Sequence, residues 1–137
     1  MKRLRGGARL LLSLLLLALV ACAAPSPPAR PADFPLHAAD QVVALHWRLD
    51  RQEGAVTAVG IVVPPLPADR ISEIVLELTG LDREGRIVSR GVDRVTARAF
   101  SGDVPWPFAV RLRPRGPEDR FALRVTDVTW RLMRGGN

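Results

Sequence analysis

The segment SEIVLELTGL at positions 72–81 carries the most regular alternation of side chains in the chain. Ile74, Leu76 and Leu78 occupy one set of alternate positions, while Glu77 and Thr79 occupy the other. Successive side chains of a strand point to opposite faces, so this pattern predicts a β-strand with one buried face.

The residues that follow predict a tight turn. Asp82 can accept backbone hydrogen bonds from the residues ahead of it, and Gly85 can adopt a positive φ without steric cost. Residues 86–90 then return as a second strand. The segment 72–90 is therefore predicted to be a β-hairpin.

Further strands are predicted on both sides of this hairpin, at 42–50, 55–63, 92–99, 108–113 and 121–132. A short helix fits 92–99 nearly as well. After Asp127 the apolar positions change phase to Val128, Trp130 and Leu132, which predicts a bulge in the last strand.

Seven short strands with turn signals between them, and no convincing helix, predict an all-β, immunoglobulin-like β-sandwich at 42–137. The only cysteine is Cys22, so no disulfide can support the core. The aliphatic strand faces must therefore form it together with five aromatic side chains, namely Trp47, Trp106, Phe108, Phe121 and Trp130.

Residues 1–21 have the organisation of an export signal. A basic start precedes the apolar run 10–20, which is shorter than the roughly 20 residues needed to span a bilayer. Leu19-Val20-Ala21-Cys22 then resembles the lipobox of bacterial lipoproteins. The resemblance implies cleavage after Ala21 and lipidation of Cys22; the alternative is an ordinary secretory signal that releases a soluble periplasmic protein.

The resemblance to lipoproteins also implies a destination. The residue after the cysteine is Ala23, not the Asp that retains many lipoproteins in the inner membrane, so we expect an outer-membrane anchor facing the periplasm. Residues 22–41 are rich in Pro and Ala and are predicted to be an extended tether. His37, near its end, is expected to be a solvated polar residue.

The charge of the chain does not favour a nucleic-acid partner. The formal net charge of +6 includes four basic side chains, those of Lys2, Arg3, Arg5 and Arg9, that lie in the export signal. The small excess that remains gives no general electrostatic reason to bind DNA or RNA.

The strand region resembles the FxLYD-type domains of bacterial envelope proteins. The similarity lies in Val59-Gly60-Ile61-Val62, Ile74-Val75-Leu76-Glu77-Leu78, Gly85-Arg86-Ile87-Val88 and Pro107-Phe108-Ala109-Val110. At the name-giving motif the chain reads Leu78-Thr79-Gly80-Leu81-Asp82, which shares only the Asp and the apolar character. The segment 85–91 is also similar to water-stress (late-embryogenesis-abundant-like) sandwiches. Either resemblance implies a β-sandwich, and the first implies no known catalytic site.

No catalytic, metal or cofactor site is predicted. His37 and His46 are expected to lie apart, one on the tether and one on the polar face of a strand. No serine lies in a nucleophile-elbow sequence. Carboxylates pair as Glu73 with Glu77, Asp82 with Glu84, and Glu118 with Asp119, on polar strand faces or in turns where acids are normally solvated.

These patterns predict a non-enzymatic, membrane-anchored envelope lipoprotein that binds a protein or glycan partner or assists an assembly. The alternative is a small envelope hydrolase or carbohydrate-binding protein that uses carboxylates such as Glu73 or Asp82. One surface feature suggests an anionic partner: Arg111, Arg113 and Arg115 alternate and are expected to project from the same side of a strand until Pro114 disturbs it. Such a row also serves as an ordinary solvated strand face.

Overall fold

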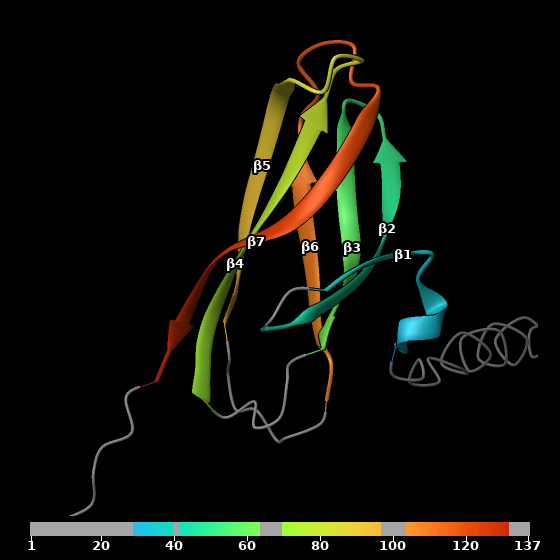
Figure 1. Cartoon of the computed structure of the whole chain (residues 1–137). Coiled ribbons are helices and arrows are strands. Elements are labelled where there is room, and N and C mark those ends of the chain that lie inside the picture. Colours follow the sequence, from blue (N-terminus) through green and yellow to red (C-terminus); the bar gives the residue numbers. More distant parts are fainter. Residues whose placement is uncertain (1–28, 40–41, 64–69, 97–103, 132–137) are drawn as a thin grey trace, which may run out of the picture.

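The computed structural model describes residues 29–39, 42–63, 70–96 and 104–131. The export segment and Cys22 lie outside the described residues. The described chain forms seven strands in two antiparallel sheets, which confirms the prediction of an all-β sandwich (Figure 1).

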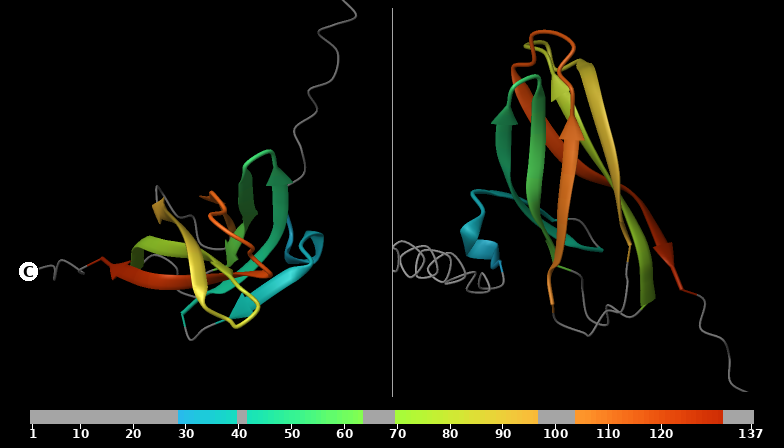
Figure 2. Two further views of the ribbon diagram at one scale, coloured as in Figure 1. Left: turned by 90° about the horizontal axis from the view of Figure 1, so that it is seen from above. Right: turned by 180° about the vertical axis from the view of Figure 1, so that it is seen from behind.

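The strands follow a short 3-10 helix, η1 (Pro31–Asp33). Their bounds are β1 (Leu36–Ala39), β2 (Ala44–Gln52), β3 (Ala55–Val63), β4 (Ile71–Leu81), β5 (Ile87–Thr96), β6 (Trp106–Leu112) and β7 (Arg120–Trp130). One sheet has the order β1-β2-β3-β6 and the other has the order β5-β4-β7. Figure 2 shows the two layers from above and from behind.

The connectivity fits that of an immunoglobulin-like domain, in which strands A, B and E share one sheet and strands C and F share the other. With β1 as an additional edge strand, β2, β3 and β6 take the places of A, B and E, and β4 and β7 take those of C and F. The first of these pairs, β2 and β3, is a hairpin with Trp47 opposite Gly60. The domain therefore has the immunoglobulin-like layered architecture that the sequence predicts.

The predicted strands at 42–50, 55–63, 72–81 and 108–113 correspond to β2, β3, β4 and β6. Strand structure is confirmed for 87–90 and 92–96, so the helix alternative for this segment is wrong, and residues 97–99 lie outside the described residues. The separation into two strands is also wrong, because β5 continues through Gly91 from Ile87 to Thr96. In the structure a Cβ at Gly91 would collide with the carbonyl oxygen of Arg111, so this glycine allows β5 to approach β6 closely.

The predicted tether at 22–41 needs a second correction. Its C-terminal part contains η1 and the edge strand β1, which pairs with β2. The Phe34 side chain between them is only 7% exposed. A short edge strand with alanines at two of its four positions has no clear alternation, so tertiary pairing rather than local pattern places it in the sheet.

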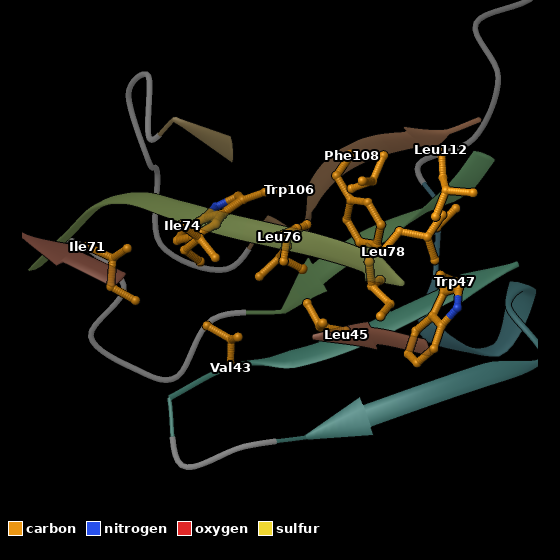
Figure 3. Packing of buried hydrophobic residues seen from close by; sticks show 14 residues of the cluster. Val43, Leu45, Trp47, Ile71, Ile74, Leu76, Leu78, Trp106, Phe108 and Leu112 are labelled. Atoms are coloured by element: carbon orange, nitrogen blue, oxygen red, sulfur yellow. The ribbon is translucent and has the colours of Figure 1, made fainter. Parts of the chain in front are cut away.

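Alternate residues of both sheets point inward and form one apolar core (Figure 3). Its most deeply buried large side chains are Ile71, Ile74, Leu76, Leu78, Leu112, Val62 and Val110. Burying one such side chain contributes about 1.5–3 kcal/mol, which explains how the fold can form without a disulfide.

Four of the five predicted core aromatics are buried or packed against the core, whereas Trp130 is not. Trp130 is 51% exposed, because it lies at the end of β7 opposite Ile71. There β7 extends away from the four-stranded sheet, as Figure 1 shows. The predicted bulge in β7 is confirmed: Val125 pairs with Leu76 and Asp127 with Val75, which leaves Thr126 as the extra residue.

The end of the sandwich that carries the β4–β5 turn is tightly packed around Gly80. A Cβ at this position would collide with the Ser89 hydroxyl and lie 2.6 Å from Cγ of Glu118. Gly80 therefore lets the loop between β6 and β7 lie against the start of β5. In the adjoining turn, Gly85 has a φ of 82°, as the turn prediction requires.

Candidate functional site

The three arginines predicted to form a strand row occupy two kinds of structure. Arg111 lies on β6 opposite Thr57, and its side chain points outward from the four-stranded sheet. The strand ends at Leu112, so Arg113 and Arg115 lie in the following loop. The expected single row is therefore wrong in geometry, although all three residues are exposed.

The loop that carries Arg113 and Arg115 is held by an acid. The carboxylate Oε1 of Glu118 accepts hydrogen bonds from the backbone N–H groups of Arg115, at 2.8 Å, and Gly116, at 3.3 Å. These bonds fix the backbone and leave both guanidinium groups directed to the surface. The loop lies at the end of the sandwich away from η1, where the described chain begins (Figure 1).

The carboxylates on the outer face of the three-stranded sheet are bound by arginines. Glu77 is only 7% exposed, and its Oε1 accepts hydrogen bonds from Nε and Nη2 of Arg124 at 2.9 and 2.6 Å. Its Oε2 accepts one from Arg90 at 3.3 Å. Glu73 pairs in the same way with Arg94 at 2.9 Å. These acids connect β4 to its neighbouring strands.

A second group of acids lines a hollow of about 380 Å³ between the β4–β5 turn and the β6–β7 loop. Its carboxylates are those of Asp82, Glu84, Glu118 and Asp119. Asp82 accepts hydrogen bonds from the backbone N and the Nε of Arg86, both at 2.8 Å, and Glu84 accepts one from Nη2 at 3.3 Å. Three of the four carboxylates thus stabilise the loops themselves.

The pKa values of two of these acids are shifted in the direction opposite to what a general acid needs. The hydrogen bond from the backbone N–H of Arg86 lowers the pKa of Asp82 below its usual value. Burial alone would raise the pKa of Glu118, but hydrogen bonds, first from the backbone of Arg115, lower it overall. A catalytic acid needs the opposite shift to hold a proton near neutral pH.

The structure brings together two histidines that the sequence analysis placed apart. His37 on β1 lies directly opposite His46 on β2, with 2.7 Å between their Nδ1 atoms. The ring centroids are 4.9 Å apart and the rings meet edge to face at 70°. His37 is therefore not an isolated tether residue. No local pattern indicated this pair, because it depends on the register of β1 against β2.

An apolar hollow of about 190 Å³ lies where β1 and β2 face β7. Its lining includes Val43, Leu45 and Leu123. It is smaller than the roughly 300–1,000 Å³ typical of small-molecule sites.

Among the described residues, no helix has the length and apolar character needed to cross a bilayer. Within the same residues, no three His, Cys, Asp or Glu side chains are grouped in a way that would suit a metal ion. Comparison of the chain with protein-family models, with curated proteins and with solved structures gave no match.

Proposed function

We propose that the chain is a non-enzymatic lipoprotein of the bacterial envelope, anchored through Cys22, whose β-sandwich binds a protein or glycan partner or assists an assembly. The lipobox resemblance and the basic, apolar start of the chain support the anchor. Ala23 supports an outer-membrane location facing the periplasm.

The main observation in favour of a non-enzymatic protein is that its carboxylates already form ion pairs with arginines. Glu77 and Glu73 are bound by arginines of neighbouring strands, and Asp82 is bound by Arg86. A hydrolase that used these acids would have to release them from ion pairs and raise their pKa values. The alternative of a small hydrolase predicts glycan cleavage that Glu73→Gln and Asp82→Asn abolish in a folded protein.

Lipidation is tested by labelling cells with a fatty-acid probe. We expect label on the wild-type chain and none on Cys22→Ala, because the thiol is the acceptor that the lipobox resemblance implies. Equal label on both proteins would contradict the anchor. Fractionation of the same cells into inner and outer membranes tests the location.

The surface we propose for the partner is the exposed arginine set Arg111, Arg113 and Arg115. No ion pair joins these guanidinium groups to an acid within the described part of the chain, so they are open to pairing with an anionic group of a partner. Exposed charge pairs contribute about 0.2–1 kcal/mol each and weaken with salt. Binding through this surface should therefore be modest and sensitive to salt.

The test compares two triple variants in association with isolated outer-membrane material. Replacing Arg111, Arg113 and Arg115 with Gln should weaken association at low salt. Replacing three other exposed arginines, Arg30, Arg48 and Arg70, removes the same charge and should have a smaller effect. If both variants and the wild type associate equally and the fold is intact, the three arginines do not bind a partner and are an ordinary solvated surface. Crosslinking of the anchored wild-type protein, followed by identification of what copurifies, would identify the partner.

A further inference from the structure

The pair formed by His37 and His46 is built by strand pairing. The two residues are register partners on β1 and β2, so their side chains leave the sheet at neighbouring points on the same face. Leu45 and Trp47, which flank His46, belong to the core. Alternation therefore places both imidazoles on the outer face of the four-stranded sheet, where solvent has access.

We propose that the two Nδ1 atoms of this cross-strand histidine pair chelate a divalent transition-metal ion from solvent.

The spacing of the nitrogen atoms is close to that of two ligands on one metal ion. Metal–imidazole bonds of about 2.0–2.1 Å place two nitrogens about 2.9 Å apart at a right angle and about 3.3 Å apart at a tetrahedral angle. The observed Nδ1–Nδ1 distance of 2.7 Å reflects a hydrogen bond between the rings. A separation larger by a few tenths of an ångström would exchange that hydrogen bond for two metal bonds.

The positions of the two histidines in their strands allow this small movement of the rings. His37 is exposed on a four-residue edge strand, while His46 is half-buried on the longer strand β2. His46 thus provides a fixed ligand, and His37 can turn about its side-chain bonds towards the ion. The remaining coordination positions are open to water.

The surroundings favour neutral imidazoles, which are the form that binds metal. On the same face, the residue opposite His46 on β3 is Ile61, which carries no charge. The nearest cation along β2, Arg48, is paired with Asp50 at 3.1 Å.

The ligand type defines the class of ion. Imidazole nitrogen suits Cu²⁺, Ni²⁺ and Zn²⁺, and the Irving–Williams order places Cu²⁺ above Zn²⁺. We therefore expect Cu²⁺ to bind more tightly than Zn²⁺, with Mg²⁺ and Ca²⁺ not competing because they prefer oxygen ligands.

The experiment titrates Cu²⁺ and Zn²⁺ into the full-length chain carrying Cys22→Ala, purified in detergent. This substitution removes the lone thiol, and the chain has no third histidine, so few other soft ligands remain. Calorimetry should give one ion per chain. Electron paramagnetic resonance of the Cu²⁺ form should show coupling to imidazole nitrogen.

The variants distinguish chelation from independent binding. His37→Ala and His46→Ala should each lower the affinity by about tenfold or more, because each removes one arm of a chelate, and the double variant should lose little further. The control Glu53→Gln removes an exposed acid of the turn between β2 and β3 and should bind as the parent does. Circular dichroism checks that all variants are folded.

Three results would overturn the proposal. The first is parent-like binding in both single variants. The second is a loss of only half the sites in each, which indicates two separate histidines. The third is a loss in Glu53→Gln as large as in the histidine variants, which places the ion elsewhere.

Discussion

The ion pair between Glu77 and Arg124 allows a direct test of whether the carboxylates of the sandwich are structural. The Glu77 side chain is 9% exposed and that of Arg124 is 59% exposed, so the pair is screened on one side only. Fully exposed pairs couple by about 0.2–1 kcal/mol. Hydrogen bonds to charged groups in less exposed places contribute about 1.5–3 kcal/mol.

The geometry of this pair indicates a coupling free energy between those two ranges. Nε and Nη2 of Arg124 both donate to Oε1 of Glu77, and Arg90 on the opposite neighbouring strand still neutralises the acid if Arg124 is lost. We therefore expect a coupling free energy of about 1 kcal/mol between Glu77 and Arg124. The single variant Glu77→Gln should cost about 1–2 kcal/mol, because it weakens contacts to both arginines.

The measurement is a double-mutant cycle of urea unfolding with Glu77→Gln, Arg124→Gln and the double variant. The matched control is the cycle for Arg48 and Asp50, whose side chains are 53% and 40% exposed and whose N–O distance is 3.1 Å. Its coupling should be smaller and should fall further with salt. If the Glu77 cycle gives no more coupling than the control cycle, the structural role assigned to this acid is wrong.

Three further predictions concern packing and pH. Gly80→Ala should destabilise the domain, because the new methyl group would overlap the side chains packed over it, whereas Gly116→Ala has open space and should be nearly neutral in the same urea assay. Leu76→Ala, at a fully buried position, should cost about 2–5 kcal/mol, while Val92→Ala, at a position 59% exposed, should cost within about 0.5 kcal/mol. The lowered pKa of His46 means that the unfolded chain binds more protons, so stability should fall as the pH drops below 6.5. An NMR titration of His46 that gave a raised value, or a loss that persisted in His46→Gln, would contradict this assignment.

Most of the fold could be predicted because strand alternation is a local property. The pattern in 72–81 identifies β4 and its buried face, and the phase change at Asp127 identifies the bulge in β7. Such features depend on one residue and its near neighbours in the chain. The total of seven strands is confirmed, although β1 was not among those predicted. The two strands predicted at 86–90 and 92–99 form the single strand β5.

The candidate site was less predictable, because its contacts join distant parts of the chain. The row of Arg111, Arg113 and Arg115 assumed a strand that continues past Leu112, where the chain instead enters a loop held by Glu118. The hydrogen bonds from Arg124 to Glu77 span 47 residues, and composition alone gives no sign of such a partner.

The sequence by itself determined the all-β class, the inward faces of the main strands and the expectation of an export and lipidation signal, since each is written in consecutive residues. Tertiary structure decided the order of strands in the two sheets, the entry of β1 into the first sheet and the meeting of His37 with His46. The physical reason is register: a four-residue strand with weak alternation gains its place from its pairing with β2 and from the packing of Ala38 against the core, and a shift of one residue would separate the two imidazoles.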